Sequence, residues 1–135
     1  MQFLALPLIA FYLSFVATIT IVSRQPTLNA QYNYLLFWSY RAILGGEIYL
    51  IAQVFWNVVL FIPIGILLSL TLGTKNKWVI KVGIGFLLSL SIEIIQLFSH
   101  RGLFEFDDII HNTLGTVIGI GIYLFFMKLH YLYQH

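Results

Sequence analysis

The sequence predicts an all-α fold: an integral membrane bundle of four transmembrane helices, with an interfacial or re-entrant segment between the first two. Hydrophobic residues make up 60% of the chain, charged residues only 9%, and the mean hydropathy is +0.92. A soluble domain of 135 residues could not bury so much apolar surface in one core. Four apolar stretches also approach or exceed the ~20 residues that a helix needs to cross a hydrocarbon core of ~30 Å.

The four predicted helices belong to a single domain, residues 1–135. They cover residues 3–22, 49–72, 79–98 and 109–129. We expect helices because lipid offers the backbone no hydrogen-bond partners. The first stretch has no Lys or Arg ahead of its apolar part, which is longer than the apolar region of a usual signal peptide. We therefore expect it to be a retained helix.

The distribution of basic residues predicts that both termini lie in the cytoplasm. An even number of spans places the two termini on one side of the membrane. That side receives all the lysines, namely Lys75, Lys77, Lys81 and Lys128, whereas the other side receives Arg24, Arg41 and Arg101. Three acidic residues near the start of the fourth stretch offset the charge of Arg101, namely Glu105, Asp107 and Asp108. The positive-inside rule then favours cytoplasmic termini in a multi-pass protein. We expect the slight basic excess to orient the chain, not to bind nucleic acid.

Between the first two helices, residues 23–48 begin as a polar loop and become aromatic from Tyr32 to Tyr40. This aromatic run is too short to cross a bilayer. An interfacial helix or a re-entrant segment is one expectation. A loop that rests on the lipid headgroups is the alternative.

Polar residues from three helices should meet in one layer near the outer surface. Asn57 lies roughly 12 Å below the outer end of the second stretch, and Glu93 within about 8 Å of the outer end of the third, at 1.5 Å per residue. The fourth stretch starts at the outer side, and its acidic residues lie at that start. Each ionisable group at the centre of a membrane helix costs roughly 2.5–3.5 kcal/mol, so their retention suggests a functional site.

The same polar residues share helix faces with small residues. Glycines and serines recur at helical spacing with them, and residues 115–119 form a GxxxG motif, which allows two helices to pack closely. The stripes are Asp108, Asn112, Gly115 and Gly119 on the fourth helix, and Gly85, Ser89, Glu93 and Gln96 on the third. We therefore expect the polar residues to face the interior of the bundle.

Several of these residues also have purely structural interpretations. Asp107 and Asp108 could cap the fourth helix, whose N-terminus favours acidic groups. Asn57 and Asn112 could form hydrogen bonds that only hold helices together. Glu93 fits such a role least well, because neither capping nor snorkelling suits a short carboxylate at its position. It could carry a proton, or pair with Arg101, Arg41 or an amide.

The sequence predicts no metal and no cofactor. It contains no cysteine, which excludes disulfides and thiolate sites. A divalent cation is the minor alternative, and its ligands could be His100, His111, Glu93 and Glu105. The spacing of these residues matches no established metal motif. No serine has the context of a catalytic nucleophile.

The polar motifs resemble those of the VanZ-like membrane proteins. The matching elements are Asn57 to Gly65, Glu93 to Gln96, Arg101, and Glu105 with Asp107, Asp108, Asn112, Gly115 and Gly119. Two positions depart from the family pattern: Leu36 stands where proline is usual, and Glu105 where aspartate is commoner. The resemblance implies a bacterial cell membrane protein. It also implies lowered susceptibility to teicoplanin and lipoglycopeptides without a change of wall precursor.

Three mechanisms are compatible with these residues. As a binding protein, the chain would hold a membrane lipid, a lipid-linked wall precursor or the lipoglycopeptide, with residues 32–40 in the groove. The ligand-binding candidates are Asn57, Glu93, Gln96, Arg101, Asp107, Asp108 and Asn112. As an enzyme acting on an envelope lipid, it would use Glu93 as acid or base with Asp108 as its partner. As a structural subunit, it would use the cluster only for assembly. We rank binding first, and the oligomeric state is left open.

Overall fold

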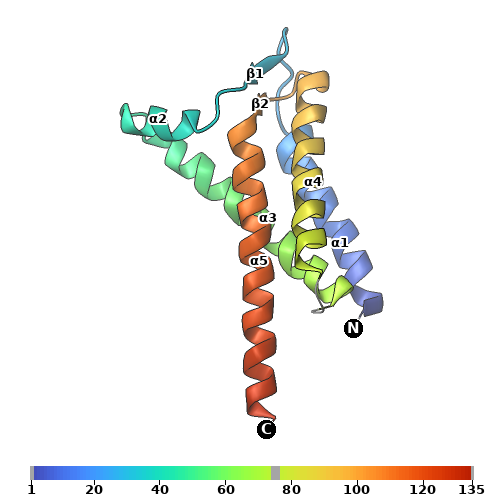
Figure 1. The fold of residues 1–135 in the computed structure, drawn as a ribbon. Coiled ribbons are helices and arrows are strands. Elements are labelled where there is room, and N and C mark those ends of the chain that lie inside the picture. Colours follow the sequence, from blue (N-terminus) through green and yellow to red (C-terminus); the bar gives the residue numbers. More distant parts are fainter. Residues whose placement is uncertain (1, 74–76, 135) are drawn as a thin grey trace.

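The computed structural model describes residues 2–73 and 77–134, and most of them are helical. Thr74, Lys75 and Asn76 of the predicted cytoplasmic turn lie outside the described residues. The elements in chain order are α1 (Gln2–Ala17), the π-helical segment η1 (Thr18–Val22), β1 (Gln31–Asn33), α2 (Trp38–Leu44), α3 (Tyr49–Leu72), α4 (Trp78–Ser99), β2 (Leu103–Glu105) and α5 (Phe106–Tyr133). The helices form a bundle that the two strands cover at one end (Figure 1).

Three helices, α3, α4 and α5, are long and apolar enough to cross a membrane. A shorter apolar helix runs over Leu6–Val22. The predicted boundaries agree closely with α3 and α4, whereas α5 begins three residues earlier than predicted and ends four residues later. Asp107 and Asp108 explain the earlier start, because acidic side chains are favourable in the first turn of a helix.

Helices α3 and α5 make the tightest contact of the bundle, and α3 crosses α5 obliquely (Figure 1). A Cβ on Gly115 would collide with the carbonyl oxygen of Val58, and one on Gly119 with that of Ile62. A Cβ on Gly65 would strike the carbonyl oxygen of Thr116 in return. The predicted close packing of the GxxxG motif is therefore confirmed, and its partner is α3.

A buried lysine of α4 contacts the end of α3. The Lys81 ammonium donates hydrogen bonds to the Gly73 carbonyl oxygen at 2.7 Å and to Ser69 Oγ at 3.3 Å. The charge thus lies at the C-terminal end of α3, where the helix dipole favours a cation. Lys81, predicted as a topological signal, also connects the two helices.

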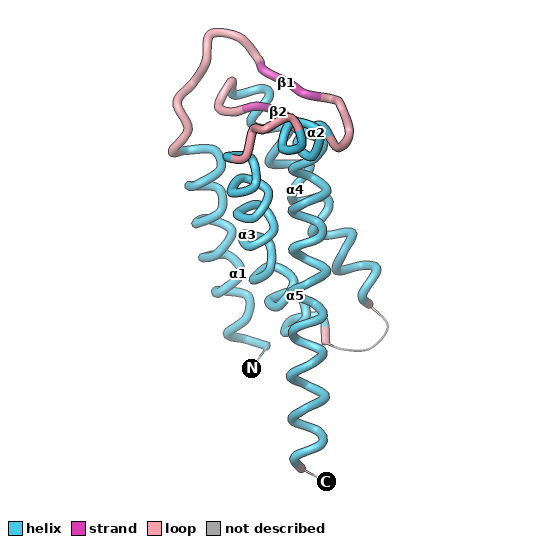
Figure 2. The backbone as a smooth tube through the Cα atoms, turned by 90° about the vertical axis from the view of Figure 1, so that its left-hand side faces the viewer, coloured by secondary structure: helices cyan, strands magenta, loops and turns pink. Residues whose placement is uncertain are grey.

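The segment between η1 and α3 contains a short helix, α2, but the aromatic run from Tyr32 to Tyr40 is not helical throughout. Residues 31–40 form β1, a turn and the start of α2, because β1 pairs in parallel with β2. Tyr32 lies opposite Phe104 in this two-stranded sheet. The all-α prediction is therefore correct for the helices but missed these two short strands. The sheet and α2 lie over one end, and both termini lie at the other (Figure 2).

Candidate functional site

Three buried carboxyl groups gather beneath the sheet. Glu93 comes from α4, Glu105 from β2 and Asp108 from α5, and their side chains are only 2%, 3% and 7% exposed. The Glu105 backbone N–H donates to Glu93 Oε2 at 2.8 Å. The Gln53 side-chain amide, one turn into α3, donates to Glu105 Oε2 at 2.8 Å. The helices α3, α4 and α5 and the two-stranded sheet thus meet at one polar centre.

Amide groups of α3 face the carboxyl groups. The Gln53 and Asn57 side chains lie against Asp108. The Asn57 Nδ2 group is nevertheless buried without a hydrogen-bond partner among the described residues, and so is Glu105 Oε1. Buried polar atoms of this kind are uncommon in folded proteins. The centre therefore has donor and acceptor capacity left over for another molecule.

Glu105 is the carboxyl group of this centre that lies outside the helices. Burial and the nearby Asp108 charge raise its pKa to about 7. The Gln53 hydrogen bond, the Trp38 indole and the Arg24 charge each lower this pKa and oppose the rise. The Trp38 indole N–H lies near Glu105 without completing a hydrogen bond of good geometry. Glu105 can therefore exchange a proton near neutral pH.

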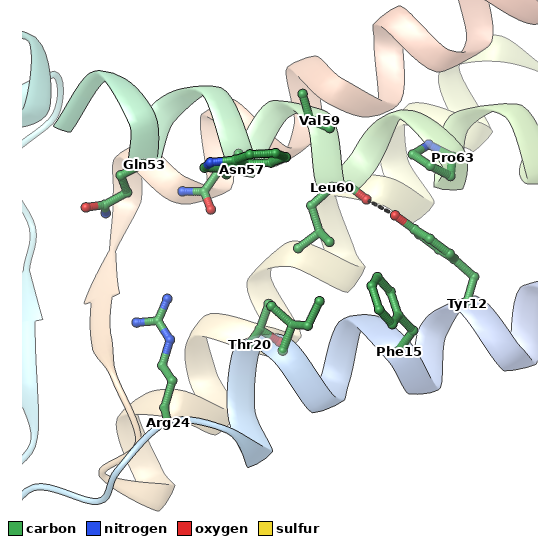
Figure 3. Close-up of a pocket in the computed structure, with 11 residues that line it drawn as sticks. Tyr12, Phe15, Thr20, Arg24, Gln53, Asn57, Val59, Leu60 and Pro63 are labelled. Atoms are coloured by element: carbon green, nitrogen blue, oxygen red, sulfur yellow. Dashed lines mark hydrogen bonds between the residues drawn. The ribbon is translucent and has the colours of Figure 1, made fainter. Parts of the chain in front are cut away.

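A pocket of about 560 Å³ opens between the first helix and α3. Its volume lies within the range of about 300–1,000 Å³ that small-molecule sites occupy. One end is polar, where the side chains of Arg24, Gln53 and Asn57 point toward one another (Figure 3). The rest is apolar and is lined by Phe15, Ile19, Val59, Leu60 and Pro63. Such a cavity suits an amphiphilic molecule.

Two further features shape the apolar part of the pocket. The Tyr12 hydroxyl donates to the Leu60 carbonyl oxygen at 2.8 Å (Figure 3) and ties α1 to α3. Pro63 has no N–H to donate to the carbonyl of Val59, four residues earlier in the helix. Both Val59 and Pro63 line the pocket. The lining includes no residue of segment 32–40, which we had expected to contribute to a groove.

The cation whose charge acts on the carboxyl groups is Arg24, whereas the sequence offered Arg101 or Arg41 as partners of Glu93. The Arg24 charge acts on Glu105, and its guanidinium donates no hydrogen bond within the part of the chain that the structure describes. The Arg101 guanidinium instead donates to the carbonyl oxygens of Val22 and Arg24, at 3.1 and 3.4 Å. Arg101 therefore holds the backbone that carries Arg24.

Two other predicted ligand-binding residues have structural partners in the fold. The Gln96 amide donates to the Thr20 carbonyl oxygen at 2.8 Å and joins α4 to η1. The Asn112 amide donates to Ser89 Oγ at 2.8 Å and joins α5 to α4. Neither residue lines the pocket.

Asp107 caps a helix, but not the helix that we considered. Its carboxylate accepts hydrogen bonds from the backbone N–H groups of Phe37, at 2.6 Å, and Ser39, at 3.0 Å, and from the Ser39 hydroxyl. These groups lie at the N-terminus of α2. Asp107 therefore holds α2 against α5, including Phe37 in its left-handed conformation (φ 59°).

Residues 2–73 and 77–134 contain no group of three or more His, Asp or Glu side chains that could hold a metal ion. His111, a candidate ligand in the sequence, has a different partner. Its Nε2 lies 2.9 Å from the Tyr40 hydroxyl, so the ring contacts α2.

Three contributors to this site are not among the site residues predicted from the sequence. Arg24 has no motif around it, and Gln53 lies one helical turn from Asn57. Glu105 was recognised in the motif but was not placed among the site residues. The spacing of Gln53 and Asn57, with Gln53 one turn closer to the outer end of α3, was the available signal for Gln53. No local signal pointed to Arg24, because its role depends on how η1 approaches α3.

These features define the class of the protein: a helical membrane protein with a buried polar centre beside an amphiphilic pocket. The chain belongs to the VanZ/LLP1 family, whose model matches residues 3–127. It is also similar to Protein VanZ of Enterococcus faecium, with 36% identity over 67 residues. That match covers 50% of this chain and 41% of the relative, so it spans less than half of the relative's length. No solved structure matches the chain.

Proposed function

We propose that the protein binds an envelope lipid, a lipid-linked wall precursor or a lipoglycopeptide at the outer layer of the cell membrane, and so contributes to teicoplanin-type resistance. The observation that carries this proposal is the link between pocket and polar centre. Gln53 lines the pocket and at the same time donates to Glu105. A bound headgroup would thus contact the amides of α3 directly and act on the carboxyl groups through them.

The proposal includes a complete membrane topology. Helix α1 and η1 continue without a break from Gln2 to Val22, close to the ~20 residues of a transmembrane helix, and would form the fourth span. The start of α1 and the end of α5 both lie away from the sheet, and α5 extends further (Figure 2). With cytoplasmic termini, the pocket's polar end would face the outer membrane surface.

Binding is favoured over catalysis by the position of the carboxyl groups. Glu93 and Asp108, the candidate acid–base pair, are absent from the pocket lining, and Glu93 accepts a backbone hydrogen bond. A general acid or base must come within hydrogen-bond reach of its substrate. Membership of the VanZ/LLP1 family and the similarity to Protein VanZ support the resistance role.

The test measures teicoplanin susceptibility and the envelope lipid profile in one susceptible bacterial host. The host expresses wild type, Glu93→Gln, Asn57→Leu or Ser91→Ala at equal levels in the membrane. Ser91 is the matched control, because it is exposed on the same helix and bonds only within it. We expect resistance to fall in Glu93→Gln and Asn57→Leu with an unchanged lipid profile. A lipid species that appears with wild type and disappears in Glu93→Gln would show an enzyme. Full resistance in both variants would leave only the structural role.

A further inference from the structure

The pocket between the first helix and α3 has an ordered gradient of polarity. On one wall, Arg24 follows the end of η1, Thr20 lies within η1, and Phe15 lies further along on α1. The antiparallel helix α3 repeats this order, from Gln53 and Asn57 to Pro63. Both walls of the pocket therefore change from polar to apolar in the same direction (Figure 3).

The polar end has the donors that an anionic oxygen needs. Arg24 presents a planar guanidinium with no hydrogen bond to any described residue, and such a group binds phosphate through paired hydrogen bonds. The Asn57 Nδ2 group, which lies against Asp108, completes no hydrogen bond of good geometry in the described structure and is a second donor. The side chains of Arg24 and Asn57 point into the same space (Figure 3).

The backbone around Arg24 is built to place its side chain there. The Arg101 guanidinium, just before β2 in the chain, donates hydrogen bonds to the carbonyl oxygens of Val22 and Arg24. Gly102 has φ +129°, and a Cβ on it would lie 3.1 Å from Arg24 Nη1 and 3.2 Å from Arg24 Cδ. A side chain at position 102 would therefore press on the arginine. Glycine satisfies both the backbone conformation and the space that Arg24 requires.

From these observations we infer that the pocket binds one phospholipid of the outer leaflet, with its phosphate on Arg24 and Asn57 and an acyl chain along Phe15, Leu60 and Pro63. This inference rests on the proposed function and names the ligand class of the same site. The apolar walls select a lipid over free phosphate, because a free anion would leave that part of the cavity without a partner. The guanidinium selects a phospholipid over an uncharged lipid.

Trp56 lines the pocket and can report on its occupant. The experiment uses the full chain in detergent, with Trp38→Phe and Trp78→Phe so that Trp56 is the remaining indole. Phosphatidylglycerol with brominated acyl chains is the probe, and quenching of Trp56 fluorescence measures binding. Brominated diacylglycerol is the uncharged comparison, and inorganic phosphate is the competitor.

We expect saturable quenching by the phosphatidylglycerol, weakened at least about tenfold in Arg24→Gln, as for the loss of a charged hydrogen bond. Arg41→Gln, an exposed arginine on α2, should match the parent. Val59→Trp should fill the apolar part of the pocket and so exclude the lipid. Because this variant carries a second indole, its lipid binding is measured by competition. Arg24→Gln with parental affinity, equal binding of diacylglycerol, or full displacement of the lipid by inorganic phosphate would each overturn the inference.

The failure of this inference can be told apart from failure of the proposed function. If Arg24→Gln binds phosphatidylglycerol like the parent while Glu93→Gln still abolishes resistance, the ligand assignment is wrong and the proposed function stands. If Arg24 controls lipid binding but no pocket variant affects resistance, the lipid site is real and the proposed role is wrong. Melting temperatures of all variants separate these results from misfolding, and Gly102→Ala provides a second way to displace the guanidinium.

Discussion

Glu93 Oε2 accepts a hydrogen bond from the backbone N–H of Glu105 at 2.8 Å, which fixes the short strand β2 to helix α4. The side chain of Glu93 is 2% exposed, so water cannot replace this bond. The residue that looked most functional in the sequence therefore also has a structural task. Substitutions at this position must separate the two.

Glu93→Gln and Glu93→Leu should differ in stability. Gln keeps an acceptor oxygen for the Glu105 N–H, whereas Leu leaves this buried N–H without a partner, a loss of about 1–3 kcal/mol. We expect Glu93→Gln to melt near wild type in detergent and Glu93→Leu to melt lower. Equal melting temperatures for both variants would contradict the structural role of the bond.

Asp107→Ala should release α2. It removes an acceptor for three donors at the α2 N-terminus, and the loss of such buried bonds costs about 1–3 kcal/mol. Limited proteolysis should then cleave residues 34–48 faster than in wild type. Glu47→Gln is the control, because among the described residues the exposed Glu47 carboxylate accepts a hydrogen bond from Tyr49 alone. Unchanged cleavage in Asp107→Ala would mean that other contacts hold α2.

Gly119→Ala and Gly121→Ala, two residues apart on α5, should have opposite outcomes. A Cβ on Gly119 would strike the Ile62 carbonyl oxygen, whereas one on Gly121 meets nothing within 4 Å. Overpacking of this kind destabilises by about 1–3 kcal/mol. The melting temperature should fall in Gly119→Ala and stay constant or rise in Gly121→Ala. A similar fall in both would count against the tight α3–α5 contact.

Stability should depend on pH through Glu105. Its folded pKa of about 7 lies above the ordinary value of 4.5, so the folded chain binds more protons than the unfolded chain between these values. The free energy of unfolding should therefore decrease as pH rises from about 4.5 to about 7, by at most about 1.4 kcal/mol per unit. Glu105→Gln should reduce this decrease in melts at pH 5 and pH 8. The carboxyl groups of Asp108 and Glu93 lie at the same centre and account for the remaining slope, whereas Arg24 faces it as a constant positive charge. An unaltered slope in Glu105→Gln would assign the whole pH dependence to those groups.

Much of the fold could be predicted because it follows from hydrophobic length and small-residue spacing. The bounds of α3 were predicted to the residue, and the glycines of α5 were recognised as a packing face. Residues 31–40 were harder, since a short aromatic run fits a strand, a loop or an interfacial helix. Their conformation depends on pairing with β2, 72 residues later in the chain.

The sequence by itself determined the membrane character, the helix lengths and the gathering of polar residues in one layer, because these depend on the period of the helix and the thickness of the bilayer. Only the tertiary structure decided the partners. It assigned Asp107 to α2, Arg101 to a backbone loop, and Arg24 to the pocket beside Gln53 and Asn57. Helical periodicity tells which face of a helix is buried, whereas the residue that meets that face depends on how the helices cross.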